Sequence, residues 1–313
     1  MMKTAESNIE QELYRFIEGG RERKIKTAGR IVVHTNRVLA LSRIAGVQVA
    51  VDELADGIKA HLVVEPGYHV RDPVEICFGV LPEEGLQRIY LDIDIREHAR
   101  LTAYAYCVFP HARNVRHIMD AHIRVREEAQ YHYIEQHVHG PTGGIEVVPS
   151  AQVELAKGSS FKTDFILTAG RVGHLDINYE TVGAEHSSME MTARVNGTGD
   201  DSIEIRETGY LSGAYARGAL ISRIAVRNTA QAHVYNKLVA SAAYARGHVD
   251  CKEIIQDHAQ AEAVPVVEVN HAKAHVTHEA AIGSVDNKQL MTLLSRGLTE
   301  EEAVDLIIQG LLQ

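Results

Sequence analysis

The chain has 313 residues, of which 45% are hydrophobic and 24% are charged, as in an ordinary folded globular protein. Lys and Arg number 32 against 42 Asp and Glu, which gives a formal net charge of −10 without a concentrated basic stripe. This balance excludes nucleic acid as an expected partner. The chain has three cysteines, Cys77, Cys107 and Cys251, and this small, odd number does not fit the disulfide framework of a secreted domain. We therefore expect reduced thiols.

The sequence contains no signal for membrane insertion or for ATP hydrolysis. No apolar run approaches the roughly 20 residues of a membrane-spanning helix. The N-terminus MMKTAESNIEQELYRF lacks the apolar core of a signal peptide, so a cytoplasmic protein without a membrane partner is expected. The chain also contains no GxxxxGK[ST] phosphate-binding loop, and any ATP hydrolysis would have to come from a partner.

The first predicted element is an amphipathic helix over residues 5–18. Its apolar residues recur at helical spacing, and Gly19-Gly20 ends the run. These apolar residues are Ile9, Leu13, Phe16 and Ile17. The basic stretch that follows, residues 21–26, indicates a solvent-exposed connector.

From about residue 30 the hydrophobic period changes from 3.6 to 2. Residues 89–95 and 101–109 alternate apolar with polar or small side chains, as strands with one buried face require. Turn clusters rich in Gly, Ser, Asn and Asp separate such strands at 140–144, 156–160 and 196–201. The pattern predicts an all-β body, and periodicity leaves a sandwich, a barrel and a parallel β-helix open.

The C-terminal part reverts to helix. Asp286 followed by Gln289 resembles a capping box in front of a first helix, which Gly297 ends. Thr299 with Glu302 forms a second capping box before the segment AVDLIIQGLL. We therefore predict two short helices joined at Gly297.

Possible metal ligands gather in residues 247–283. Cys251 is followed by His271, His275, His278 and Glu279, so sulfur, nitrogen and oxygen donors lie in one short segment. Such a mixture suits an iron or iron–sulfur site. The apolar alternation around these histidines favours strands, in which His271 and His275 would face opposite to His278, and this argues against a helical three-histidine zinc site.

Two stretches in this part of the chain carry a family resemblance. THEAAIGSVDNKQLMTLLSRGLTEEEA at 277–303, preceded by GHVDCKEII at 247–255, resembles the C-terminal signature of the SufB/SufD scaffold family. The resemblance implies a mainly β protein with a right-handed parallel β-helix core. On this basis we divide the chain into an N-terminal helical segment (1–29), a β-helix core (30–276) and a C-terminal helical segment (277–313).

The resemblance also implies a site for an iron–sulfur cluster that is built and then released. Its ligands would be Cys251, His278 and Glu279, with His271 and His275 as auxiliary groups. The cluster type and the sulfur donor stay open. Thr277 stands where SufB-like members often carry Glu, and the chain lacks their N-terminal extension and additional cysteines. SufD-like members tend to lack the cysteine and carry Gly after the His, so the chain is more similar to SufB.

The last part of the family signature implies a docking site for a SufC-like ABC ATPase. The expected partner-binding residues are Leu290, Leu293, Leu294, Arg296, Leu298, Leu306 and Ile307. Because the chain carries one SufB/SufD-type core, we expect a homodimer that recruits two ATPase subunits. The chain itself is expected to be a scaffold and not an enzyme.

Two other functions remain open from the residues. One is a mononuclear metalloenzyme that uses His271, His275, His278 and Glu279, and the other is a metal-free adaptor that regulates an ATPase. Outside this segment, Cys77 and Cys107 lie on apolar strand phases, which indicates core packing. His137 and His139 share one strand face as a possible metal pair, although a solvated position beside the Gly-rich turn is expected.

Overall fold

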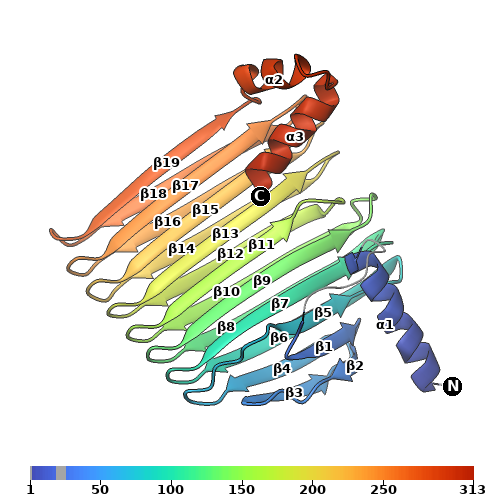
Figure 1. Ribbon diagram of the computed structural model, residues 1–313, viewed down its shortest axis with the longest axis vertical. Coiled ribbons are helices and arrows are strands. Elements are labelled where there is room, and N and C mark those ends of the chain that lie inside the picture. The colour runs from blue at the N-terminus through green and yellow to red at the C-terminus, as the bar shows by residue number, and fades with distance from the viewer. Residues whose placement is uncertain (1, 19–25) are drawn as a thin grey trace.

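The computed structural model describes residues 2–18 and 26–313, with side chains for residues 7–17 and 26–313. The expected helix stop at Gly19-Gly20 and the basic residues 21–25 lie outside the described residues. Figure 1 shows a long stack of strands with one helix beside the N-terminal strands and two helices at the C-terminal end. The helices are α1 (Met2–Glu18), α2 (Asn287–Leu294) and α3 (Glu300–Leu312). None of the described helices is long and apolar enough to cross a membrane.

The strands of the described residues form two sheets, of ten and nine strands, between which the chain alternates. The first sheet contains β1 (Gly29–His34), β2 (Arg37–Leu41), β5 (Val74–Gly79), β7 (Arg100–Phe109), β9 (Gln130–His139), β11 (Ser160–Leu167), β13 (Ser188–Gly197), β15 (Arg217–Val226), β17 (Arg246–Ile255) and β19 (His275–Gly283). The second contains β3 (Val47–Glu53), β4 (Gly57–Val64), β6 (Glu84–Ile95), β8 (Asn114–Val125), β10 (Ile145–Leu155), β12 (Gly173–Gly183), β14 (Ser202–Leu211), β16 (Gln231–Ala240) and β18 (Gln260–Val269).

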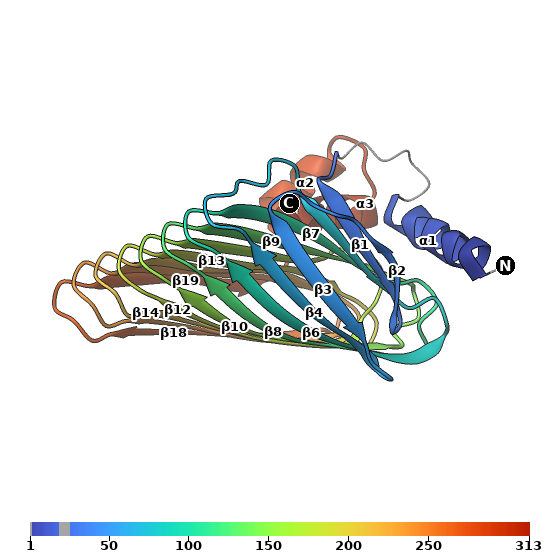
Figure 2. The ribbon, with the colours of Figure 1, turned by 90° about the horizontal axis from the view of Figure 1, so that it is seen from below.

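The pairing pattern decides between the three all-β architectures. Each strand from β4 to β17 pairs in parallel with the strand two places further along the chain, so every coil adds one strand to each sheet. Among the named strands that the structure describes, only the pairs β1–β2 and β3–β4 are antiparallel. Figure 2 shows the two sheets as layers that face each other. The parallel β-helix with helical ends is therefore confirmed.

The two ends of the stack differ in how they are covered. Leu13 of α1 packs on Val32, Cys77 and Val108, on the outer face of the first sheet. At the other end, β19 and β18 are the last strands of the two sheets. β19 continues past residue 276 to Gly283, and helix begins again only at Asn287. Val269 is 48% exposed and Ile282 43% exposed, so apolar side chains remain uncovered at this open end.

The interior is mostly aliphatic but contains polar side chains. Glu207 on β14 faces inward, is 1% exposed, and its Oε2 atom has no hydrogen-bond partner among the described residues. Burial raises the pKa of Glu207 from 4.5 to about 8. This carboxyl group therefore stays protonated in the folded chain at a pH where the unfolded chain has released the proton.

Replacing Glu207 with glutamine is expected to stabilise the fold increasingly as the pH rises above about 4.5, with the full effect above about pH 8. A raised folded-state pKa means that the free energy of unfolding falls as pH rises from the unfolded pKa of 4.5 to the folded pKa of about 8. The variant should thus match wild type near pH 4.5 and exceed it by roughly 2 kcal/mol or more at about pH 8.5. Denaturant unfolding across pH measures this difference. The exposed Glu180 on neighbouring β12 provides the matched control, since Glu180→Gln should show no such pH dependence.

Candidate functional site

Cys251 lies on β17 and faces the interior of the β-helix. Side chains alternate along this strand, and Val249, Cys251 and Glu253 are buried on the inward side. The Cys251 side chain has no exposed surface, and the side-chain amide of Asn236 donates a hydrogen bond to its Sγ at 3.7 Å. The thiol is therefore sealed within a single chain.

The surroundings keep this thiol protonated. Burial raises the pKa of Cys251, and the nearby Glu253 carboxyl group raises it further, whereas hydrogen bonds with Ser222 and Asn236 act in the opposite direction. Burial likewise raises the pKa of Glu253 to about 7. Because a thiolate is the form that binds metal or attacks sulfur, Cys251 must lose its proton to a metal or become exposed before it reacts.

His278 and Glu279 lie on β19, the strand next to β17, but face opposite ways. Val249 aligns with His278, and Cys251 aligns with Ala280, so His278 shares the inward side with Cys251 and is displaced from it by two residues along the strand. Glu279 points to the outer side, where its Oε1 lies 3.6 Å from the ammonium group of Lys252. One chain therefore brings Cys251 and His278 to the same side and leaves Glu279 on the other.

The two auxiliary histidines do not complete a site within one chain. His275 aligns with Arg246 on the outer side of β19, opposite to His278. His271 lies in the turn before β19, and its Nδ1 accepts a hydrogen bond from the backbone of Lys273 at 3.1 Å. As expected for a strand, His275 and His278 face opposite ways, and within the described part of the chain they form no cluster of three ligands with Glu279.

A different group of possible ligands lies deep inside the β-helix. Cys107 on β7, with Glu135 and His137 on β9, places one sulfur, one oxygen and one nitrogen atom within 4.8 Å of one another. His137 is 3% exposed and the neighbouring His139 is 9% exposed. The expectation that the two histidines share a strand face holds, but the expectation that they are solvated was wrong. Their alternation places both inside, in line with Cys107 and Phe109 of the adjacent strand.

The C-terminal helices begin as the capping patterns predicted. The Asp286 side chain accepts from the backbone of Gln289 at the start of α2, and Thr299 and Glu302 form the reciprocal capping box of α3. Gly297 between them has a φ of +93°, a conformation that favours glycine. These caps fix where both helices begin.

A groove separates the two C-terminal helices from the end of the first sheet. It has a volume of about 840 Å³. Its apolar lining includes Ile254 of β17, Ile282 of β19 and, from the expected docking residues, Leu293, Leu306 and Ile307. The helices therefore present part of their apolar surface to an open groove beside the strand that carries His278.

Comparison with known proteins adds family evidence to this geometry. Residues 80–311 match the family described as SUF system FeS cluster assembly, SufBD core domain. The chain is 35% identical over 283 residues to an iron–sulfur cluster assembly SufBD family protein of Methanocaldococcus jannaschii, with 90% of each chain covered.

Two further relatives show how much of the chain the similarity covers. A SufBD family protein of Pyrococcus horikoshii is 34% identical over 90% of this chain and 86% of its own length. The iron–sulfur cluster assembly protein SufB of Bacillus subtilis is 33% identical over 70 residues, which are 22% of this chain and 15% of that protein. Since the family match covers most of the chain, and two relatives of similar length exceed 30% identity, the chain belongs to the SufBD family of iron–sulfur cluster assembly proteins.

Proposed function

We propose that this chain is the scaffold on which a nascent iron–sulfur cluster is assembled and released, with Cys251, His278 and Glu279 as its ligands. The observation that carries the proposal is that Cys251 and His278 lie on the last two strands of the first sheet, beside the strand edges at which a second copy can pair. Standard cluster sites use four cysteine ligands. Mixed sulfur, nitrogen and oxygen ligands hold a cluster less firmly than four cysteines, which suits a cluster that is passed on. The cluster is therefore cargo, and its type stays open.

A second copy of the chain would complete this site. The outer edges of β18 and β19 have no neighbouring strand in the described chain, and Val264, Val269 and Ile282 are exposed beside them. An unpaired edge with apolar side chains is a template for pairing with another chain. A two-fold axis at this end covers both edges at once and brings Cys251 of one copy near His278 and Glu279 of the other.

The docking of a SufC-like ABC ATPase is proposed on the two C-terminal helices. α3 is anchored to the β-helix by Ile308 and Leu312, which pack on Ala225. An ion pair between Arg227 and Asp305 adds to this anchor. None of the residues of α2 is buried, and the apolar residues that face away from the anchor leave a surface for a partner. The proposed contact residues are Leu290, Leu293, Leu294, Arg296, Leu298, Leu306 and Ile307.

Closure of the partner ATPase would supply the movement that the buried thiol needs. Cys251 is fully covered and its pKa is raised, so the resting chain holds an unreactive thiol. A nucleotide-driven movement of α2 and α3 would act on β17 and β19, which line the same groove. We propose that this movement opens the interior at Cys251, as in other domain closures that expose a site.

Replacing Leu306 with aspartate is expected to weaken ATPase binding at least about 10-fold without loss of stability, because a charge placed in an apolar contact must be desolvated. Leu306 is 48% exposed, so the isolated chain tolerates the change. Titration calorimetry with a SufC-type ATPase measures the affinity. Ile308→Asp, on the buried side of the same helix, should instead lower the melting temperature. If Leu306→Asp binds the ATPase as tightly as wild type does, this surface is not the ATPase-binding site.

Anaerobic reconstitution with ferrous iron and sulfide tests the assembly function itself. The scaffold predicts a coloured cluster that depends on Cys251. A mononuclear enzyme that uses His271, His275, His278 and Glu279 predicts a colourless protein with tightly bound metal. A metal-free adaptor predicts ATPase binding alone.

A further inference from the structure

We propose that the interior of the β-helix holds a resident divalent transition-metal ion, bound by Cys107 Sγ, Glu135 Oε1 and His137 Nε2. This site lies on β7 and β9 in the N-terminal half of the stack, whereas the proposed cluster ligands lie on β17 and β19 at the open end. The inference goes beyond cluster assembly, since a resident ion here is separate from the cargo.

The spacing of the three donor atoms fits one tetrahedral ion after small adjustments. Cys107 Sγ lies 3.7 Å from Glu135 Oε1, and Glu135 Oε1 lies 2.9 Å from His137 Nε2. All three atoms are within 4.8 Å of one another. Ligands of a tetrahedral zinc ion lie about 3.5 Å apart, as its bond lengths of about 2.0 to 2.3 Å require. The three side chains are almost fully buried and need to move by only a fraction of that spacing.

The hydrogen-bond chain around His137 presents the correct nitrogen to an ion. The backbone carbonyl of Arg171 can only accept, so Nδ1 of His139 donates to it at 3.1 Å. His139 Nε2 must then accept the hydrogen bond that His137 Nδ1 donates at 3.0 Å. The lone pair of His137 is thereby left on Nε2, which faces Glu135. A hydrogen bond from the other ring nitrogen is the usual way in which a metal-binding histidine is oriented.

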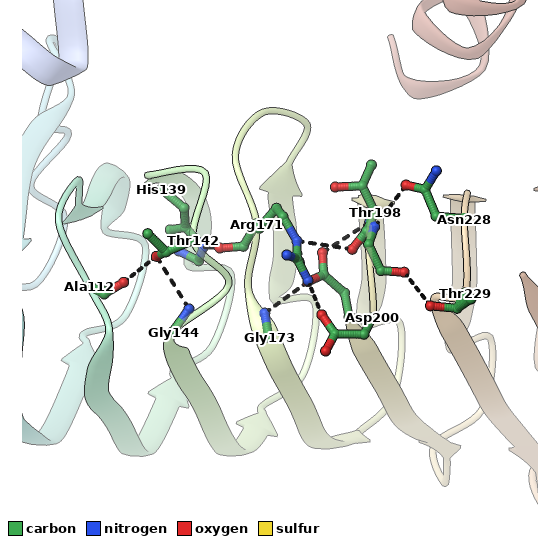
Figure 3. A network of polar contacts seen from close by, with 12 residues as sticks. Ala112, His139, Thr142, Gly144, Arg171, Gly173, Thr198, Asp200, Asn228 and Thr229 are labelled. Carbon is green, nitrogen blue, oxygen red and sulfur yellow. Dashed lines mark hydrogen bonds and ion pairs between the residues drawn. The ribbon is translucent and has the colours of Figure 1, made fainter.

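Figure 3 shows the polar contacts of Arg171, whose backbone carbonyl ends this chain. The guanidinium group of Arg171 donates from Nε to the backbone carbonyl of Thr198 at 3.1 Å and also bonds Asp200 and Asp201. Asp201 is itself fixed by the backbone of Thr198 at 2.9 Å. The backbone N–H of Arg171 also donates to the carbonyl of Gly140 at 3.0 Å, so both the backbone and the side chain hold the residue whose carbonyl accepts from His139.

The charges of the site also favour an ion. Since His137 Nε2 accepts, Glu135 must carry the proton of the 2.9 Å hydrogen bond between them. The Cys107 thiol donates to Glu135 Oε1 at 3.7 Å, so the thiol and the carboxyl group each carry a proton when no ion is bound. A divalent cation displaces one proton from Glu135 and one from Cys107 into solvent. The resulting thiolate and carboxylate balance its two charges, and no net charge is buried.

A separate observation points to a ligand in this layer of the core. Gln87 donates its side-chain amide to the carbonyls of Thr35 and Gly79, so its Oε1 accepts from His117 Nδ1 at 3.0 Å. His117 Nε2 therefore carries a lone pair, and this atom is buried without a hydrogen-bond partner among the described residues. The ring of His117 lies 6.2 Å from that of His137, centroid to centroid. An unpartnered buried nitrogen atom thus lies beside the ring of His137.

The donor set identifies the class of ion. Thiolate and imidazole favour Zn²⁺, Fe²⁺ or Co²⁺ over Mg²⁺ and Ca²⁺, which prefer oxygen ligands. Co²⁺ is the probe of choice, because thiolate binding gives it a charge-transfer band in the near ultraviolet. Because the site is sealed, the full chain is refolded in the presence of Co²⁺, and bound metal is then measured by absorption and elemental analysis.

We expect one Co²⁺ ion per wild-type chain, with a thiolate band that is lost in Cys107→Ala. Glu135→Gln should weaken the affinity for Co²⁺ by about 100-fold or more. Mutation of residues that only hydrogen-bond to the ligands already lowers metal affinity by about 10 to 100-fold, and Glu135 is a ligand itself. Glutamine can donate the same hydrogen bond to His137 as the protonated carboxyl group, so the metal-free variant should melt at the same temperature as metal-free wild type. Loss of metal in Glu135→Gln then reports on ligation and not on unfolding.

Two cysteine controls separate this site from the rest of the chain. Cys77→Ala, on the outer face of the same sheet beneath α1, should keep the ion and its thiolate band. Cys251→Ala should also keep them, whatever its effect on the iron–sulfur cluster. A wild-type chain that refolds without bound Co²⁺, or a band that persists in Cys107→Ala, would overturn the resident site and leave the assembly proposal intact.

Discussion

Replacing Cys251 with alanine is expected to abolish the visible iron–sulfur cluster after anaerobic reconstitution with ferrous iron and sulfide. The physical reason is that Cys251 supplies the one thiol near the open end, the other two cysteines lying on β5 and β7. Nitrogen and oxygen ligands alone bind sulfide-bridged iron weakly, because thiolate is the usual ligand of such clusters. The absorption of the cluster and the bound iron and sulfide are the measurements.

Cys77→Ala is the matched control for this experiment, because it removes an equally buried thiol beneath α1. It should leave the reconstituted cluster unchanged. Unchanged iron and sulfide binding in Cys251→Ala, with ATPase association preserved, would support the metal-free adaptor. A colourless wild-type protein that retains metal at His271, His275, His278 and Glu279 would support the mononuclear enzyme instead.

Mixing two inactive variants is expected to restore part of the cluster-binding capacity. In our proposal each site takes Cys251 from one copy and His278 from the other. A dimer of Cys251→Ala with His278→Ala therefore keeps one intact pair and loses the other. If the subunits exchange at random, about one quarter of the wild-type cluster should form, because half of the dimers are mixed and each of these holds one of two sites.

This mixing experiment distinguishes a shared site from a site within one chain. Cys251 and His278 already share the inward side of one chain, so an intramolecular pair is the direct alternative. An intramolecular pair would give no cluster in the mixture, since every chain lacks one of the two ligands. Light scattering before and after mixing confirms that dimers form and that subunits exchange. Cys251→Ala alone, treated in the same way, gives the baseline for cluster formation.

The proposed ion at Cys107 and the proposed cluster at Cys251 have different physical settings. The first set of ligands lies in the sealed interior and has a hydrogen-bond chain that orients its histidine. The second lies beside exposed strand edges and lacks a third ligand on the same side within one chain. A sealed, oriented site suits an ion that stays, and an incomplete site at the end of the stack suits a cargo that leaves.

The sequence by itself determined the local structure of this protein. Alternation of apolar residues over 89–95 and 101–109 predicted strands, and the caps at Asp286 and Thr299 predicted where the C-terminal helices begin. These signals are local, because side-chain period and cap geometry depend on residues only a few positions apart. The choice of a parallel β-helix over a sandwich or barrel came from the family resemblance, since periodicity is the same in all three.

Only the tertiary structure decided which side chains meet. His137 and Cys107 come together because β7 and β9 align residue by residue, and neither spacing nor composition shows that register. The same register places His278 with Cys251 and turns Glu279 to the other side, although His278 and Glu279 are adjacent in the sequence. Strand alternation separates neighbours, and coil stacking joins residues about one coil apart, so the positions of ligands follow from pairing between strands and not from distance along the chain.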